Sequence, residues 1–430
     1  MRYLKKAQST QSTQDTSTKA VVQEILTSIR ENGETSALEY SAKLDKYSGD
    51  VIMKKSQIEQ LTKSIPQSVK DDVRFAYDRV KKFAEKQKDS IQEFDCELSD
   101  GLFAGQRLIP VDTVGCYVPG GRYAHIASAV MSITTAKVAG VRNIIACSSP
   151  KDEQGMHPVI AYTMNLCGAD KILNLGGVQA IASMAFGLFD CEKANFIVGP
   201  GNRFVAEAKR TLFGEVGIDQ IAGPTEILVI ADSSSDPLLV AADLVGQAEH
   251  GIDSPAWLIS TSEEVAQKTM ELVSELIKDL PESHAAAAAK SWEEYGEVVI
   301  CDTKEEAAKL SDEYAPEHLE IHTKDDDWYL ENLRSYGSLF IGEETNVSFG
   351  DKCSGPNHIL PTREAAKYTG GLSVHKFIKV VTWQKMSRDS VRQVAPVSAR
   401  ISRQEGMEAH ARTSDVRLSK YFPEESFTLS

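Results

Sequence analysis

The chain has 430 residues, of which 42% are hydrophobic and 25% are charged, and its formal net charge is -15. This composition is typical of a folded protein that is long enough for two or more domains. The excess of acidic residues argues against a surface for nucleic acids or anionic membranes, so the sequence predicts neither kind of partner.

The seven cysteines are scattered along the chain, and no two of them form a Cys-x-x-Cys pair. This odd number and irregular spacing favour reduced thiols over a disulfide framework or a zinc knuckle. The opening residues, MRYLKKAQSTQSTQDTST, lack the apolar stretch of a secretory signal, and no run approaches the roughly 18 apolar residues of a membrane span. We therefore expect a cytoplasmic location.

The predicted elements change character along the chain. Residues 9–18 are polar and predict a mobile or surface segment, and residues from about 20 to 95 show a charged helical pattern. Short apolar runs then alternate with helical stretches, which predicts parallel sheets covered by helices on both faces. The runs are DTVGCYVPGG, RNIIACSSP, DKILNLGGVQAIA, ANFIVGPGNRFVAEAKR, EILVIAD and AWLIST, followed by EVVICD, HLEIHT and GSLFIG. The tail from about residue 380 reads as charged and helical with little apolar material, so we expect it to dock on another surface.

Two glycine-containing turns join a predicted strand to a predicted helix, at LNLGGVQAIA (173–182) and FIVGPGNRFVAEAKR (196–210). In doubly wound sheets such turns bring backbone N–H groups and a helix N-terminus to the carboxyl edge of the sheet, which suits a phosphate. Neither turn has the three glycines of G-x-G-x-x-G, so a tight turn without a ligand explains the pattern equally well.

The stretch DPLLVAADLVGQAEHGIDSP (236–255) predicts a helix that Asp236 caps and Gly251 ends. Asp243, Gln247 and His250 follow one another at spacings of four and three, so they lie in one column on the helix. The predicted apolar stripe beside this column comprises Leu238, Ala241, Ala242, Val245 and Ala248.

Three further stretches hold groups capable of proton transfer or metal binding. In EYAPEHLEIHT, Glu317 and His318 open a strand on which His318, Glu320 and His322 share one face; the alternative is a solvated strand face. FGDKCSGPNHILPT contains Asp351, Asn357 and His358, and taken alone it is more often a surface turn. RQEGMEAHARTSDVR contains Glu405 and His410, and taken alone it is more often a solvated helix. Gln247, His250, Asp351 and His410 together offer the nitrogen and oxygen ligands that Zn²⁺ accepts, but their spacing does not decide whether they meet. The residues alone indicate a two-domain α/β enzyme with a candidate metal site.

The segment GIDQIAGPTEILVIADSSSDPLLVAADLVGQAEHG (217–251) resembles the signature of the histidinol dehydrogenase family. The motifs VGCYVPGG, GGVQAIA, GPGN, PEHLEI, GDKCSGPNHILPT and EGMEAH occur in the order of that family, over about residues 20–420. The resemblance implies an α/β fold of two Rossmann-like domains with parallel sheets and small N- and C-terminal helical segments, in a domain-swapped homodimer. The implied boundaries are an N-terminal segment 1–19, a first domain 20–117 with 227–372, a second domain 118–226, and an arm 373–430 that docks on the partner subunit.

The resemblance also implies an activity, which is a zinc-dependent, NAD-linked oxidation of a primary alcohol through an aldehyde to a carboxylate. It implies that His318 takes the alcohol proton and that Glu317 activates a water molecule. One Zn²⁺ per subunit would be held by Gln247, His250 and Asp351 and by His410 of the partner subunit. Asp243 would either orient Gln247 or His250 or simply pack against the backbone. The implied NAD⁺ contacts are Tyr117, Gln179 and Asn202.

The chain departs from the histidinol enzymes where substrate binds. Arg122 and His125 replace a small apolar stretch after YVPGG, Lys352 replaces a tyrosine, and Lys376 replaces an aspartate. These changes resemble the sulfopropanediol 3-dehydrogenase branch and predict a small anionic alcohol, (R)-2,3-dihydroxypropane-1-sulfonate, as substrate. L-Histidinol is the alternative substrate, and a catalytically silent metal-binding homologue is a third hypothesis. The predicted substrate contacts are Thr225, Arg122, His125, Lys352, Asn357, His358 and Glu405.

Overall fold

The computed structural model describes residues 1–9, 16–120, 124–221 and 223–429, which form two compact units. Unit 1 comprises Met1–Lys88 and Val111–Phe377, and unit 2 comprises Asp89–Pro110 and Ile378–Ser430. Most of the predicted surface segment and Arg122 lie outside the described residues. Within the described ranges, no helix combines the length and the apolar character needed to cross a membrane.

Unit 1 contains a six-stranded sheet in the order β1-β11-β10-β9-β12-β13, in which only β1 runs antiparallel to its neighbour. The strands are β1 (Arg2–Lys5), β9 (Ile227–Ala231), β10 (Ala256–Ser260), β11 (Glu297–Ile300), β12 (His318–His322) and β13 (Ser338–Ile341). The first residues were predicted to form a helical segment, and this prediction is wrong for Arg2–Lys5. This short stretch gains more hydrogen bonds as an edge strand on β11 than four residues could form as an isolated helix.

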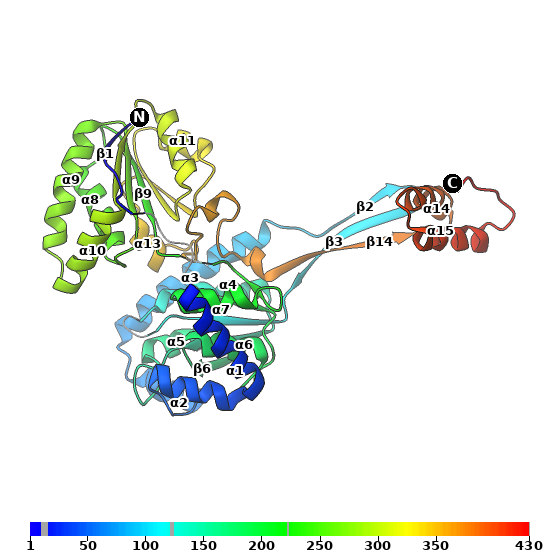
Figure 1. Ribbon diagram of the computed structural model, residues 1–430, viewed down its shortest axis with the longest axis horizontal. Coiled ribbons are helices and arrows are strands. Elements are labelled where there is room, and N and C mark those ends of the chain that lie inside the picture. The colour runs from blue at the N-terminus through cyan, green and yellow to red at the C-terminus, as the bar shows by residue number, and fades with distance from the viewer. Residues whose placement is uncertain (10–15, 121–123, 222, 430) are drawn as a thin grey trace. The chain divides into compact units, whose positions relative to one another are not determined.

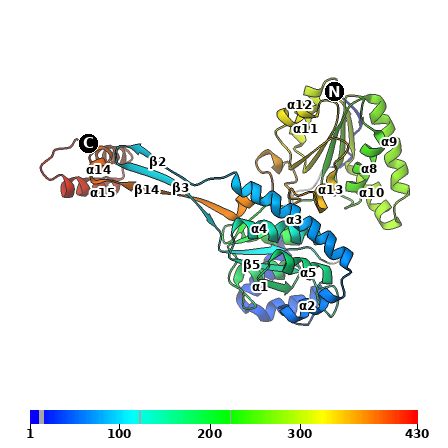
Figure 2. The same ribbon diagram turned by 180° about the vertical axis from the view of Figure 1, so that it is seen from behind.

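Helices cover both faces of this sheet, as the views from the front and from behind show (Figure 1 and Figure 2). Alternate residues of β9 point to opposite sides, so Ile227 and Val229 belong to one apolar core and Leu228 and Ile230 to another. The first core is closed by α8 (Pro237–Ala248), α9 (Glu263–Lys278) and α10 (Glu282–Tyr295), and the second by α11 (Lys304–Tyr314) and α12 (Asp326–Asn332). The short α13 (Val347–Lys352) follows β13.

A second sheet in unit 1 has five parallel strands in the order β6-β5-β4-β7-β8. They are β4 (Thr113–Tyr117), β5 (Asn143–Ser148), β6 (Lys171–Asn174), β7 (Phe196–Val198) and β8 (Gly217–Ile218). The helices that follow these strands are α4 (Ile126–Ala139), α5 (Pro158–Cys167), α6 (Gly177–Phe186) and α7 (Arg203–Leu212). The strand order reverses at β4, and such a switch point forms a crevice at the carboxyl edge of the sheet.

The N-terminal helices of unit 1 are α1 (Thr16–Tyr40), α2 (Lys55–Lys63) and α3 (Gln67–Asp89), with a π-helical turn at Ser41–Asp45. Val22, Ile25 and Leu26 of α1 lie in the core of the five-stranded sheet, and β4 is the central strand of that sheet. The predicted grouping of residues 20–117 with residues 227–372 differs from this packing, because the apolar face of α1 is buried against α6 and α7.

Unit 2 contains a three-stranded antiparallel sheet in the order β14-β3-β2, formed by β2 (Phe94–Ser99), β3 (Leu102–Pro110) and β14 (Ile378–Met386). Two helices follow, α14 (Arg388–Gln404) and α15 (Glu408–Tyr421), which pack through a small core of Ala395, Leu418 and Phe422. The prediction of a helical tail is confirmed from residue 388, but residues 378–386 form a strand along the whole of β3.

All nine apolar runs that predicted strands form strands, and the α/β class with parallel sheets is confirmed.

Candidate active site

Two residues of the predicted polar column, Asp243 and Gln247, lie on α8, and His250 follows two residues after its end. Asp236 caps this helix by accepting a hydrogen bond from the backbone N–H of Leu238 at 2.8 Å. The helix ends at Ala248, so the predicted end at Gly251 is wrong by three residues. The apolar stripe also differs, because Leu238 and Ala242 are exposed while Val240 and Leu244 are buried.

A cavity of about 650 Å³ gathers three of the predicted zinc ligands. Gln247 and His250 reach it from the end of α8, and Asp351 reaches it from the end of α13. In parallel sheets each helix runs back against its strand, so helix ends return to the amino edge of the sheet. His318 is the first residue of β12 and therefore lies at the same edge. The chain thus brings together ligand types that are separated by more than 100 residues.

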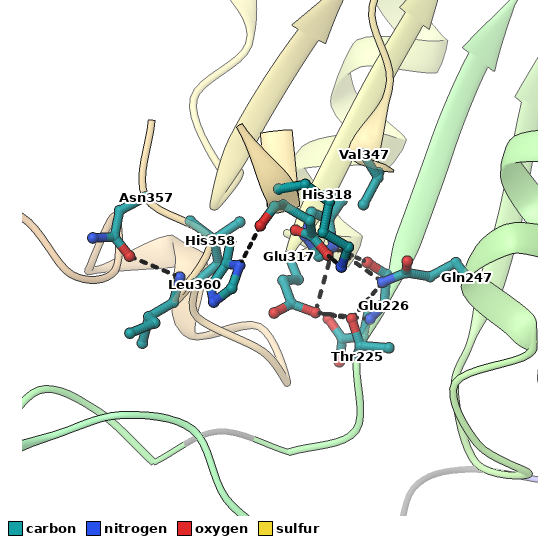
Figure 3. A network of polar contacts seen from close by, with 12 residues as sticks. Thr225, Glu226, Gln247, Glu317, His318, Val347, Asn357, His358 and Leu360 are labelled. Carbon is teal, nitrogen blue, oxygen red and sulfur yellow. Dashed lines mark hydrogen bonds and ion pairs between the residues drawn. The ribbon is translucent and has the colours of Figure 1, made fainter. Parts of the chain in front are cut away.

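Glu317 and His318 are buried, so the solvated strand face is excluded. Glu317 Oε2 accepts hydrogen bonds from the Thr225 hydroxyl at 2.6 Å and from the Glu226 N–H at 3.0 Å. His318 Nδ1 lies 2.9 Å from the carbonyl oxygen of Glu226, which can only accept, so Nδ1 carries the hydrogen (Figure 3). His318 Nε2 is then the basic nitrogen, and it lies 3.3 Å from Asp351 Oδ1.

The charges of this network shift its pKa values in opposite directions. Burial raises the pKa of Glu317. Burial acts to lower the pKa of His318, but Glu317 and Asp351 together raise it to about 9. Burial acts to raise the pKa of Asp351, whereas the hydrogen bond and charge of His318 hold it well below its usual range. With both carboxylates beside it the imidazole therefore holds its second proton near neutral pH, and a change in its surroundings that lowers this pKa would make it a proton acceptor.

Gln247, one of the predicted zinc ligands, is connected to Glu317 and His318 through Thr225 and by a direct contact. The amide of Gln247 donates to the Thr225 hydroxyl, and its Nε2 lies 3.2 Å from His318 Nδ1. Thr225, predicted to contact substrate, is thus held between Gln247 and Glu317.

His358 and Asn357 have their side chains engaged within the protein. His358 Nδ1 donates to the carbonyl oxygen of Asp351 at 2.7 Å, and its Nε2 lies 3.0 Å from the Ser128 hydroxyl. The amide of Asn357 donates to the Met131 carbonyl at 3.1 Å and accepts from a backbone N–H at 3.0 Å. His358 still lines the 650 Å³ cavity, but Asn357 is not among its lining residues.

A second cavity of about 780 Å³ lies at the carboxyl edge of the five-stranded sheet and contains all three predicted NAD⁺ contacts. Tyr117 ends β4, and its hydroxyl accepts from the N–H of Gly177 at 3.2 Å. Asn202 caps α7, where its side chain accepts from Phe204 and Val205. Both glycine-containing turns thus border one cavity, together with the N-termini of α6 and α7.

His125 lines both cavities, and Lys352 lines the one that contains the predicted zinc ligands. Burial, with the charges of His358 and Lys352, lowers the pKa of His125 to about 4. His125 therefore presents a neutral imidazole between the two cavities. Glu405 and His410 belong to unit 2, where both side chains are exposed.

The comparisons with known proteins agree with one another. The family model described as histidinol dehydrogenase matches residues 8–418. A histidinol dehydrogenase homolog of Pelagibacter ubique is 61% identical over 97% of this chain and 98% of its own length. The sulfopropanediol 3-dehydrogenase of Ruegeria pomeroyi is 53% identical over 100% of this chain and 99% of its own.

The protein belongs to the histidinol dehydrogenase family. The crystal structure of histidinol dehydrogenase from Elizabethkingia anophelis superposes with a TM-score of 0.90 at 32% identity, covering 96% of this chain and 94% of the other. The predicted family resemblance is therefore confirmed over almost the whole chain.

The residues present fit the metal and cofactor used in the histidinol dehydrogenase family. Gln247, His250 and Asp351 offer an amide oxygen, an imidazole nitrogen and a carboxylate oxygen, a donor set that Zn²⁺ accepts with one position left open. In the other cavity, the Gln179 side-chain oxygen is buried with no hydrogen-bond partner in the described parts of the chain. An acceptor left in this state suits a ligand hydroxyl or amide.

Two residues of this family member were not predicted from the sequence. Glu226 is buried beside Glu317, its Oε1 accepts from the N–H of Arg363 at 2.8 Å, and burial raises its pKa to about 8. Asp45 accepts from the Gly176 N–H at 3.1 Å and from the Gln179 amide at 2.8 Å. Glu226 could have been predicted, because it is a carboxylate that directly precedes an apolar strand. Asp45 could not, because nothing in the charged helical pattern around it distinguishes it from surface residues.

Proposed function

We propose that this protein is a zinc-dependent, NAD-linked dehydrogenase that oxidises a primary alcohol through an aldehyde to a carboxylate in the cytoplasm. The observation that carries the proposal is the sharing of His125 by two cavities, one with the predicted NAD⁺ contacts and one with the predicted ligands of one Zn²⁺ per subunit. Hydride transfer requires the cofactor and the alcohol to meet, and adjoining cavities meet this requirement.

The overall reaction converts one alcohol, one water and two NAD⁺ into one carboxylate, two NADH and three protons. When bound, Zn²⁺ would hold the alcohol oxygen and NAD⁺ would accept the hydrides. The protein's own contribution is proton transfer. His318 Nε2 accepts the hydroxyl proton, and Glu317, oriented by Thr225 and the Glu226 N–H, takes a proton from the water that attacks the aldehyde.

Asp351 has two roles in this proposal. Its carboxylate is a zinc ligand, and it also contributes to the raised pKa of His318. A cation bound to Asp351 would neutralise the charge of that carboxylate, so that of the two carboxylates only Glu317 would raise the pKa of His318. The pKa of His318 then moves toward neutrality, where a general base is most effective.

The substrate that we favour is (R)-2,3-dihydroxypropane-1-sulfonate, oxidised to sulfolactate. Lys352 supports this choice, because it supplies a cationic group to the lining of the cavity. His125 supports it as a neutral hydrogen-bond donor, and the Ruegeria pomeroyi relative bears the name of this activity. Among the other predicted substrate contacts, Thr225 is fixed by its hydrogen bond to Glu317 and His358 by its hydrogen bond to the Asp351 carbonyl. The Asn357 amide donates to the Met131 carbonyl, so its effect on substrate would be indirect, through the position of this backbone.

Histidinol is the second candidate, because Asp243, Glu249 and Asp351 also line the cavity and carboxylates suit an ammonium group. Substrate comparison separates the two. We expect two NADH per sulfonate and no NADH from histidinol, and Lys352→Gln should raise KM for the sulfonate about two- to fivefold, the loss of roughly one exposed ion pair. NADH from histidinol alone contradicts the substrate choice, and bound zinc without NADH from either substrate indicates a catalytically silent homologue.

We further propose a domain-swapped homodimer of two Rossmann-like domains per subunit, in which unit 2 supplies His410 and Glu405 to the partner. Its support is the surface of unit 2. Val380, Trp383 and Phe103 on its strands are exposed, and exposed apolar groups of this kind are typical of interaction sites. Light scattering tests the dimer, and mixing His318→Asn with His410→Asn subunits tests the exchange, since a shared site predicts partial recovery of activity.

A further inference from the structure

A second group of ionisable side chains lies between α8 and β12, outside the set formed by Gln247, His250 and Asp351. It consists of Asp243, one helical turn before Gln247, and of Glu320 and His322 on β12. One ligand atom from each of the three lies within 4.8 Å of the others. His322 Nε2 is 3.6 Å from Glu320 Oε2 and 3.9 Å from Asp243 Oδ2.

These separations are too long for hydrogen bonds, which join such atoms at about 2.7–3.2 Å. They are close to the spacing of two ligands on one metal ion. For bonds of about 2.0–2.1 Å and tetrahedral angles, two ligand atoms lie about 3.4 Å apart. The spacing of the three side chains is therefore that of ligands placed around one ion.

The atoms that would face such an ion lack other partners. Glu320 is 0% exposed and His322 is 1% exposed. Glu320 Oε2 and both ring nitrogens of His322 have no hydrogen-bond partner among the residues that the structure describes. The remaining carboxylate oxygens are used, since Glu320 Oε1 accepts from the Val347 N–H at 2.8 Å and Asp243 Oδ1 accepts from Asn346 at 3.3 Å. Each of the two carboxylates thus has one oxygen that faces the other members of the group and could bind an ion.

The charge of the group also requires compensation. Burial acts to lower the pKa of His322, but Glu320 and Asp243 raise it, and even a protonated imidazole leaves two ionised carboxylates with one excess negative charge. In the described ranges no lysine or arginine pairs with Asp243 or Glu320. Burial and the neighbouring Glu320 raise the pKa of Asp243, as expected of crowded carboxylates. Isolated buried charges are costly, and a divalent cation would neutralise this pair.

We propose that Asp243, Glu320 and His322 form a second divalent metal site, suited to Zn²⁺ or Mn²⁺. One imidazole and two carboxylates are borderline-to-hard ligands that both ions accept. Asp243 also lines the 650 Å³ cavity, which provides a path from solvent. The ion would fasten α8, β12 and the start of α13, the elements that carry Gln247, His318 and Asp351, so its role is to fix the geometry of the neighbouring site.

The test is the metal content of the full-length protein after incubation with Zn²⁺ and gel filtration. We expect two ions per subunit in the wild type, one in His322→Gln and one in Asp351→Asn, which is the matched control for the other site. Binding of NADH checks that each variant is folded. If His322→Gln loses an ion and Asp351→Asn does not, the result supports the site at Asp243, Glu320 and His322 and contradicts the zinc site of the proposed function.

One ion in the wild type that His322→Gln retains overturns the proposal, because the three side chains then share protons instead of a metal. A second measurement does not depend on a variant. Anomalous diffraction at the zinc edge from crystals of the wild type should give a peak among Asp243, Glu320 and His322, and the absence of a peak at that position in zinc-soaked crystals refutes the site.

Discussion

The ion pair of Lys209 with Asp219 offers a stringent test of how the 780 Å³ cavity, in which we propose that NAD⁺ binds, is held. Both side chains are buried, at 3% and 0% exposure. Lys209 also donates to the carbonyl oxygen of Gly199 at 2.9 Å, and Asp219 accepts from the Gly199 N–H at 2.8 Å. The pair therefore clamps both backbone groups of the glycine that begins the turn between β7 and α7.

Lys209→Met removes the ammonium and leaves the Asp219 carboxylate buried without a cation. Breaking a buried pair in this way costs about 3–5 kcal/mol. At a sensitivity of about 2–4 °C per kcal/mol for a domain of this size, the thermal midpoint should fall by on the order of 10 °C. Because the turn borders the cavity proposed to bind NAD⁺, the affinity for NADH should also fall, by about tenfold for each 1.4 kcal/mol of distortion that binding must reverse.

The assay is differential scanning fluorimetry together with NADH titration by fluorescence. Lys268→Met is the matched control, since Lys268 pairs with Glu271 at 3.0 Å where both side chains are exposed. Exposed pairs contribute about 0–1 kcal/mol, so the control should move the midpoint by no more than a few degrees. Equal shifts in the two variants, with unchanged NADH affinity, would refute the reasoning.

Three further predictions follow from single contacts. His318→Asn should lower kcat by about 10²–10⁴-fold with NADH binding retained, measured by steady-state kinetics, because the general base is lost; an unchanged kcat would exclude that role. Glu226→Gln keeps a side-chain oxygen that accepts from the Arg363 N–H. In the folded wild type the pKa of Glu226 is raised to about 8, so the folded state loses stability as the pH rises from the usual pKa of a glutamate to about 8. The thermal midpoint of the variant relative to the wild type should therefore be higher at pH 8 than at pH 5.5, and a constant difference would contradict the burial of a proton there. Gly199→Ala should destabilise the fold by about 1–2 kcal/mol or more and weaken NADH binding, because a Cβ would lie 2.0 Å from the Tyr117 carbonyl oxygen at a φ of +116°; normal binding would contradict this geometry.

The sequence allowed the central sheets and most of the site to be predicted. Buried parallel strands are continuous apolar runs, and ILVIA (227–231) and AWLIS (256–260) could be recognised for that reason. The polar column on α8 was visible because an apolar helix has no packing reason to carry Gln247 and His250. Convergence of Asp351 with these residues was not predictable from spacing, since it depends on two helix ends returning to one edge of a sheet.

The elements that the sequence did not predict are those without a one-sided apolar pattern. The strand 378–386 is exposed along almost its whole length, so its residues lack the alternation that marks a half-buried strand. The burial of Glu320 and His322 was also unexpected, because their alternation with Leu319 and Ile321 is the pattern of a strand with one wet face. Helices on both sides of β12 remove that wet face, and this depends on the whole fold rather than on the local sequence.

The central claim is that one site carries out both oxidation steps with Glu317 and His318, and the number of NADH molecules formed per alcohol tests it most directly. With limiting (R)-2,3-dihydroxypropane-1-sulfonate, zinc-loaded enzyme and excess NAD⁺, the account predicts two NADH per substrate and a carboxylate product. One NADH per substrate, with the aldehyde released to solution, would contradict it.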